Sequence, residues 1–114
     1  MITIYHNPRC RKSREGLALV EASGQAFEIR KYLDETLSFE ELSQLIDYLG
    51  ISPINLVRKN EADWKTNFKG KNLNDKEIIQ AMVDFPKLIE RPILVKDKKA
   101  VVGRPPEKFS DLLS

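Results

Sequence analysis

The residue best suited to nucleophilic chemistry in this chain is Cys10, its single cysteine. An apolar, β-branched run precedes it and a helical pattern follows it, so Cys10 should cap the N-terminus of a helix. Helix N–H groups, the helix dipole and nearby cations all stabilise a thiolate. We therefore predict that Cys10 is a reactive thiolate and a nucleophile. The nearby cations are Arg9, Arg11, Lys12 and Arg14.

Cys10 and Ser13 form a C-x-x-S pattern, which becomes informative only between a strand and a helix. The alternative is a buried, inert cysteine, but charged residues surround Cys10 and disfavour that interpretation. Because the second position is serine, no cysteine of this chain can resolve an adduct on Cys10. An external thiol must do so.

The single histidine, His6, lies four residues before the cysteine. It either supports the thiolate as a cation or hydrogen-bond donor, or is a partly exposed residue at a strand end. One cysteine and one histidine do not complete a zinc site, so we predict no metal.

Three further arginines, Arg58, Arg91 and Arg104, stand at predicted ends of helices or strands. The guanidinium group presents its donors as a fixed fork, which suits planar or tetrahedral oxyanions. A single arginine is as often merely solvated, and the residues alone do not show that the three converge.

The pattern of elements predicts how Cys10 is positioned. Ile2 to Tyr5 should be a buried strand, a helix should run from Arg11 to Ser23-Gly24, and Phe27 to Tyr32 should be a strand near a sheet edge. This β-α-β order predicts parallel strands.

A helical insertion is expected at about residues 38–85, beginning with a capping box at Ser38 and Glu41. Residues 60–72 should hold a short helix or an ordered loop, and Met82 and Trp64 should be packing residues. Residues 93–102 predict a β-hairpin, and a last helix opens at Pro105-Pro106. We predict an α/β fold with a mixed sheet: one thioredoxin-like domain over residues 1–114, with Pro92 at that fold's cis-proline position.

Composition narrows the classes of partner. The 19 basic and 17 acidic residues give a net charge of +2, which favours neither nucleic acids nor anionic membranes. There is no run of 18 apolar residues, and the N-terminus predicts a strand instead of a signal peptide. We expect a cytoplasmic protein, and a monomer because no strong exposed apolar stripe is evident.

Four separated motifs in this order resemble the glutathione/glutaredoxin-dependent arsenate reductase family. They are ITIYHNPxCxxSR at the start, LxRKN from Leu56, ERPI from Glu90, and GRP from Gly103. The resemblance implies that Cys10 is the nucleophile, that His6 supports its thiolate, and that Arg58, Arg91 and Arg104 bind the oxyanion.

The same resemblance implies a reaction without a bound cofactor. Cys10 would attack arsenate, glutathione would serve as co-substrate, and glutaredoxin would complete the reduction to arsenite. Two alternatives use the same fold. One is a glutaredoxin-like protein acting on glutathione adducts, and the other is a non-enzymatic regulator that binds RNA polymerase.

Overall fold

The computed structural model describes residues 2–114, which divide into two compact units. Met1–Glu35 and Arg91–Ser114 form the first, called here the sheet unit. Thr36–Glu90 form the second, the helical unit. Each unit is described separately below.

The sheet unit contains a four-stranded mixed sheet with the order β2-β1-β3-β4. Its strands are β1 (Ile2–Tyr5), β2 (Phe27–Arg30), β3 (Ile93–Lys96) and β4 (Lys99–Val102), with α1 (Arg11–Ala22) between the first two. β1 and β2 are parallel, whereas β3 is antiparallel to both β1 and β4. The predicted α/β fold class and the parallel β-α-β unit are confirmed.

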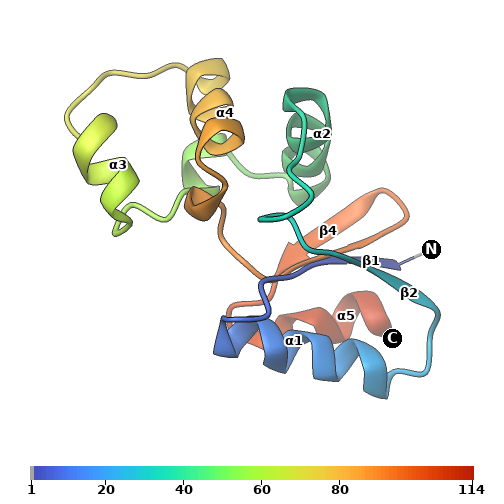
Figure 1. The fold of residues 1–114 in the computed structure, drawn as a ribbon. Helices are drawn as coiled ribbons and strands as arrows, with labels where there is room; N and C mark the ends of the chain where they lie inside the picture. The colour runs from blue at the N-terminus through green and yellow to red at the C-terminus, as the bar shows by residue number, and fades with distance from the viewer. Residues whose placement is uncertain (1) are drawn as a thin grey trace. The chain divides into compact units, whose positions relative to one another are not determined.

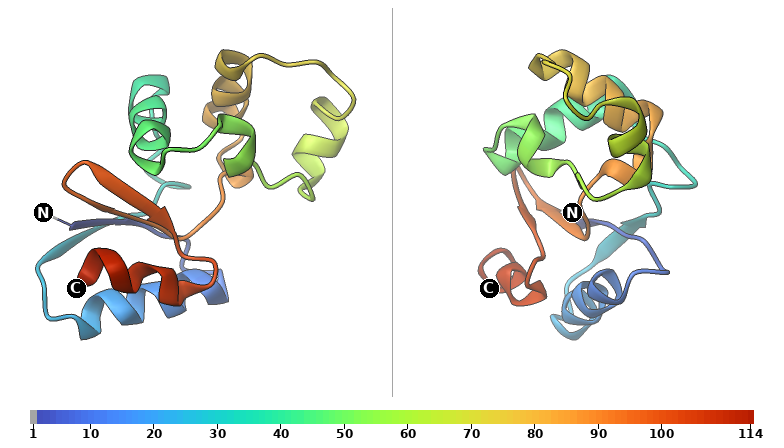
Figure 2. Two further views of the ribbon diagram at one scale, coloured as in Figure 1. Left: turned by 180° about the vertical axis from the view of Figure 1, so that it is seen from behind. Right: turned by 90° about the vertical axis from the view of Figure 1, so that its left-hand side faces the viewer.

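One face of this sheet is covered by α1 together with the C-terminal helical segment (Figures 1 and 2). That segment is a 3₁₀ turn, η3 (Pro106–Phe109), followed by α5 (Ser110–Leu113). The predicted last helix therefore begins as 3₁₀ structure. Proline at its first position supplies a helical φ but no N–H.

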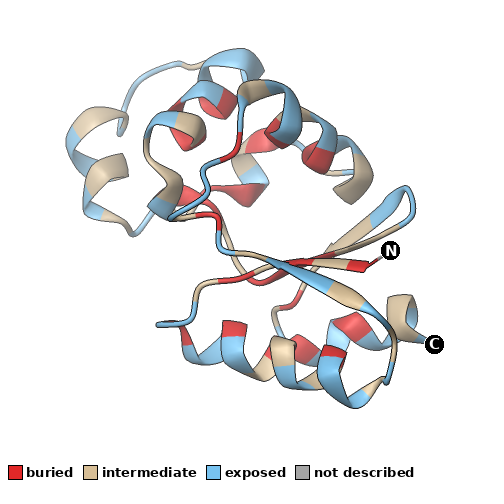
Figure 3. Cartoon of the chain, turned by 45° about the vertical axis from the view of Figure 1, so that its right-hand side comes forward, coloured by how far each residue is buried: buried red, intermediate tan, exposed pale blue. Residues whose placement is uncertain are grey.

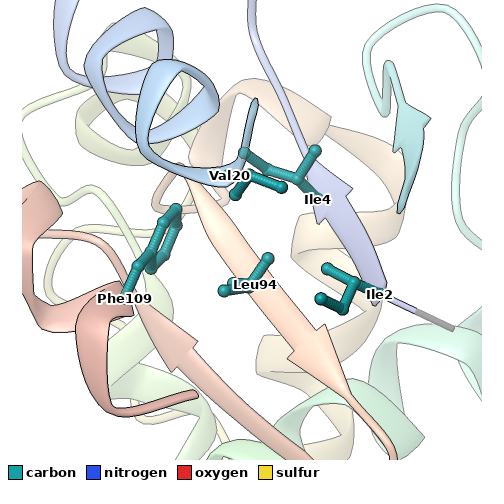
Figure 4. Close-up of a cluster of buried hydrophobic side chains, with 5 residues drawn as sticks. All are labelled: Ile2, Ile4, Val20, Leu94 and Phe109. Carbon is teal, nitrogen blue, oxygen red and sulfur yellow. The ribbon is translucent and has the colours of Figure 1, made fainter. Parts of the chain in front are cut away.

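A small apolar cluster joins the sheet to these helices (Figure 4). Burying each large side chain of this kind contributes roughly 1.5–3 kcal/mol to folding. Phe109 is fully buried, so the C-terminal segment is part of the core. The cluster consists of Ile2, Ile4, Val20, Leu94 and Phe109.

The second strand differs from its prediction at its C-terminal end. β2 stops at Arg30, and Lys31 begins a turn in which its carbonyl accepts the N–H groups of Asp34 and Glu35. Tyr32 is buried within that turn. The alternation of apolar and polar residues therefore extends beyond the last residue of the strand. Ile29 is 41% exposed, which fits a strand that has a neighbour on one side only.

The helical unit contains α2 (Phe39–Leu49), α3 (Ala62–Asn67) and α4 (Asp75–Asp84), with 3₁₀ turns η1 (Pro53–Leu56) and η2 (Pro86–Leu88). A single antiparallel bridge between Val57 and Ile89 joins the segments after the two 3₁₀ turns. No helix within residues 2–114 has the length and apolar run needed to cross a membrane.

Reciprocal side-chain bonds start the two longest helices of this unit. Ser38 and Glu41 form the predicted capping box of α2, and Asn74 and Glu77 form an equivalent box at the start of α4. Each box satisfies two N–H groups that the helix itself leaves without partners. α2 ends at Gly50, whose φ of 66° lies in the left-handed region.

Burial within each unit follows these elements (Figure 3). Met82 is fully buried on α4, as predicted. Trp64 is half-buried and packs on Phe68 with ring centroids 5.4 Å apart. On α1 the buried residues are Ser13, Gly16 and Val20, which share one face of the helix.

Candidate active site

Cys10 occupies the N-cap position of α1, immediately before the first helical residue. Its backbone is extended, with φ −101° and ψ 123°, and only 8% of the residue is exposed. An N-cap side chain lies beside the N–H groups of the first turn. The fold therefore brings the sulfur to the positive end of the helix dipole.

Asn7 organises the loop that leads to the cysteine. Its carbonyl accepts the Cys10 N–H at 3.0 Å. Its side-chain Oδ1 accepts the Arg9 N–H, also at 3.0 Å. The Asn7 N–H in turn donates to Ser13 Oγ at 2.9 Å. The loop is thus hydrogen-bonded on both sides of Cys10.

Two arginines from the other end of the chain complete the surroundings of the sulfur. The Arg104 Nη2 lies 3.7 Å from Cys10 Sγ, and the Arg104 Nε donates to the Arg91 carbonyl at 3.0 Å. Arg91 precedes β3 and Arg104 follows β4. The hairpin pairing and a 2.8 Å hydrogen bond from the Gly103 N–H to the Pro92 carbonyl hold these two ends together.

The pKa of Cys10 lies below its ordinary value because several attractions outweigh one opposing effect. Burial is the largest influence and raises the pKa. The N–H of Ser13, the charge of Arg91, the N–H of Lys12 and the charge of Arg104 all lower it. Neither N–H forms a capping hydrogen bond of standard geometry with the sulfur, so both act mainly as dipoles.

His6 is buried, with 4% of the residue exposed, so the partly exposed alternative is wrong. Its Nδ1 lies 2.7 Å from Ser13 Oγ. Burial, followed by the charge of Lys31, lowers the pKa of His6 below 6.5, and contact with Ser13 only partly offsets this. The neutral imidazole is therefore favoured at neutral pH.

The sequence predicts that the cations adjacent to Cys10 stabilise its thiolate, but other cations lower its pKa most. The side chains of the adjacent cations are exposed. Two of them contact other groups: Arg11 pairs with Glu15 at 3.6 Å, and Arg14 Nη1 donates to the Pro8 carbonyl. The cations that lower the Cys10 pKa most are Arg91 and Arg104. The four exposed residues are Arg9, Arg11, Lys12 and Arg14.

The Arg91–Pro92 peptide bond is cis, and so is the Arg104–Pro105 bond, which the sequence analysis did not consider. Pro92 is packed closely. A Cβ added to Gly16 would lie 2.8 Å from the Pro92 ring and 2.8 Å from the Phe109 ring. A Cβ on Gly103 would meet the same two rings, at 3.1 Å and 2.8 Å. Two glycines thus make room for the proline next to Arg91.

Arg58 belongs to the helical unit and lies among its acidic residues. Its Nη1 is 3.3 Å from Glu61 Oε2, and its Nε is 4.0 Å from Glu90 Oε1. The same Nη1 donates to the Lys87 carbonyl at 3.2 Å. The site assembled within the sheet unit contains Cys10, Arg91 and Arg104, and a role for Arg58 stays a prediction.

Sequence reasoning missed two features of this site. Ser13 was considered only as a missing second cysteine, although its hydroxyl bonds both His6 and Asn7. The close packing at Gly16 was also missed, although a glycine inside a predicted helix is itself a signal of close approach. No group of three or more His, Cys, Asp or Glu side chains placed to hold a metal occurs within residues 2–114.

Comparisons with known proteins identify the family to which this chain belongs. The model of the ArsC family matches residues 5–112, so the chain belongs to the ArsC family. An arsenate reductase of Neisseria meningitidis is 40% identical over 98% of this chain and 97% of its own length. The uncharacterised protein YfgD of Escherichia coli is 43% identical over 98% of this chain and 96% of its own. A solved structure, an arsenate reductase from Vibrio cholerae, superposes with a TM-score of 0.91 at 44% identity and covers 96% of this chain and 95% of that one. These matches confirm the resemblance to arsenate reductases and the thioredoxin-like fold.

Proposed function

We propose that this protein is an oxidoreductase that reduces arsenate to arsenite with Cys10 as the nucleophile. The observation that carries the proposal is the pairing of a thiol whose pKa is lowered with a guanidinium 3.7 Å from its sulfur. A nucleophile that must attack an anion needs a cation to neutralise the approaching charge. The names of the relatives indicate which oxyanion is reduced, since those from Neisseria and Vibrio are arsenate reductases.

The first step forms a bond between Cys10 Sγ and arsenic(V) and expels one arsenate oxygen as water. Arg91 and Arg104 bind the remaining oxygens, and their forked donors match a tetrahedral oxyanion. We include Arg58 as a third ligand of the oxyanion, as the family resemblance implies. No metal or bound cofactor takes part in this step.

The reducing equivalents come from outside the chain, since Cys10 has no second cysteine to form a disulfide. A glutathione thiol replaces a second oxygen on arsenic, which leaves as water. A glutaredoxin thiolate then attacks the glutathione sulfur, forming a mixed disulfide and leaving the electron pair of the broken S–As bond on arsenic. Arsenic is now in the +3 state on Cys10, and water releases it as arsenite and restores the thiolate.

The proposal extends to the setting of the protein. We propose a cytoplasmic monomer whose partners are glutathione, glutaredoxin and arsenate or another small oxyanion. A reducing compartment keeps a low-pKa thiol available, which supports this setting.

The test is an assay of arsenate-dependent NADPH oxidation coupled through glutathione, glutaredoxin and glutathione reductase. We expect turnover by the purified protein and its loss in Cys10→Ser and in Arg91→Ala. Arg9→Ala is the matched control, because it removes an exposed arginine from the same neighbourhood and should leave turnover unchanged.

Absence of turnover alongside a reactive Cys10 would overturn arsenate as the substrate. Activity on glutathione adducts, independent of Arg58, Arg91 and Arg104, would instead identify a glutaredoxin-like protein. Copurification with RNA polymerase and no turnover on either substrate would point to the regulator.

A further inference from the structure

From the contacts of its buried hydroxyl, we infer that Ser13 is a positioning residue for Cys10 and that His6 influences the thiol through Ser13 instead of contacting the sulfur. The inference rests on the proposed function only in taking Cys10 as the reacting residue.

The Ser13 hydroxyl is fully buried and bonded to the segment that precedes the cysteine. None of the residue is exposed. Its Oγ accepts the Asn7 N–H at 2.9 Å and lies 2.7 Å from the His6 Nδ1. A buried hydroxyl without partners would be costly, so these two bonds fix where the hydroxyl sits.

Those bonds connect the end of β1 to the first turn of α1 and enclose Cys10 between them. His6 and Asn7 follow β1, and Ser13 is the third residue of α1. Asn7 also accepts the Cys10 N–H with its carbonyl. Ser13 Oγ thus holds His6 and Asn7, and Asn7 in turn holds the Cys10 N–H, so the position of the cysteine depends on the Ser13 hydroxyl through Asn7.

The backbone of Ser13 gives this ring its effect on the sulfur. After burial, which raises the pKa, the Ser13 N–H is the largest influence on Cys10 and it favours the thiolate. Holding the hydroxyl in place holds this N–H toward the sulfur. The remaining groups that favour the thiolate are Arg91, the Lys12 N–H and Arg104.

His6 can bond Ser13 as a neutral imidazole. A hydroxyl has one proton and two lone pairs, and the Asn7 N–H occupies one lone pair. Either tautomer of neutral His6 then completes the second bond, as donor or as acceptor. The charged groups that face His6 are Lys31, Arg14 and Glu21, and burial outweighs all of them in disfavouring the cation.

Alkylation of Cys10 by iodoacetamide as a function of pH tests this arrangement without arsenate. The variants are Ser13→Ala, His6→Ala and their combination, with exposed Ser110→Ala as the matched serine control. We expect Ser13→Ala to slow alkylation at pH 7 by about tenfold, as one unit of pKa would. His6→Ala should slow the wild type but change the Ser13→Ala protein by less than about twofold.

A His6→Ala effect of the same size in both backgrounds would overturn the inference, because His6 would then act without Ser13. An unchanged rate in Ser13→Ala would overturn it as well.

If Ser13→Ala does not fold by circular dichroism, His6→Asn decides instead. The asparagine amide can take the place of Nδ1 and bond Ser13 Oγ without carrying a charge. Alkylation closer to wild type than in His6→Ala supports the inference, and a rate equal to His6→Ala overturns it. Because alkylation needs no arsenate, these outcomes are independent of whether the proposed reductase activity is found.

Discussion

Two groups of cations can be compared around Cys10. One is adjacent in sequence and exposed, and includes Arg9 and Arg11. The other, Arg91 and Arg104, is more than eighty residues away along the chain and lowers the pKa of the thiol. The cations adjacent in sequence lie on the exposed surface near Cys10. The cations that act on the sulfur are placed there by the strands that they flank. Exposed charges are screened by water and salt, whereas a half-buried guanidinium close to the sulfur is screened much less.

The largest effect in this comparison should come from Arg104→Ala. Removing a cation 3.7 Å from the sulfur should slow Cys10 alkylation at pH 7 by at least roughly tenfold. Arg104→Lys keeps the charge and should recover part of the rate, without the forked geometry. An Arg104→Ala protein that reacts as fast as the wild type would contradict the electrostatic account.

Gly103→Ala tests whether packing at the hairpin end holds these arginines in place. The added Cβ would lie 2.8 Å from the Phe109 ring, so we expect a loss of about 1–3 kcal/mol in urea unfolding. Thiol reactivity should fall too, because Arg104 follows directly.

The control for this substitution is Ala18→Gly on the exposed face of α1. It should cost only about 0.5–1 kcal/mol, from helix propensity, and leave the thiol unchanged. Equal losses of stability in both variants would count against the close packing at Gly103.

A third prediction concerns pH and the buried histidine. Burial lowers the pKa of His6 below 6.5, so the unfolded chain takes up this proton at a higher pH than the folded chain does. The stability that the folded chain gains by keeping His6 neutral is complete above pH 6.5. It is lost as the pH falls below that value. Urea unfolding at several pH values should show wild type losing stability relative to His6→Asn on acidification. The opposite trend would mean a raised pKa.

The smallest effect should come from the cations adjacent in sequence. Replacing both Arg9 and Arg11 with glutamine should change the Cys10 alkylation rate by less than about twofold at physiological salt, where exposed charges are screened. The Arg11–Glu15 pair is exposed and contributes at most about 0.5 kcal/mol to stability. A large effect would mean that this stretch binds the reacting anion directly.

The sequence predicted most of the fold because its signals are local. An apolar, β-branched run predicted β1, and the capping box at Ser38 predicted the start of α2. Cys10 at the N-cap also followed from a strand-to-helix junction. The prediction was wrong where the same apolar residue could be buried in two kinds of structure. Tyr32 is buried in a turn, although the alternating pattern indicated a strand.

The site was only partly predictable, because its interactions cross the chain. The approach of Arg104 to Cys10 depends on strand register and on a hairpin that brings Pro92 and Gly103 together. The spacing of apolar residues along the sequence does not reveal the distance between Arg104 and the Cys10 sulfur. The family motifs include Arg91 and Arg104, the two arginines that lower the Cys10 pKa, whereas adjacency in sequence pointed to the exposed cations. The Ser13–His6 bond likewise depends on the rotation of α1 relative to β1, which residue types do not reveal.

The shared ring contact of Gly16 and Gly103 has a consequence for how this protein can vary. Both positions face Phe109 and Pro92, so the four residues divide one fixed volume among them. A larger residue at either glycine becomes tolerable only when the rings that it would meet, those of Phe109 and Pro92, shift or are replaced by smaller groups. Substitutions at these positions should therefore be accepted in compensating pairs, and a survey of natural or selected variants should find them changing together.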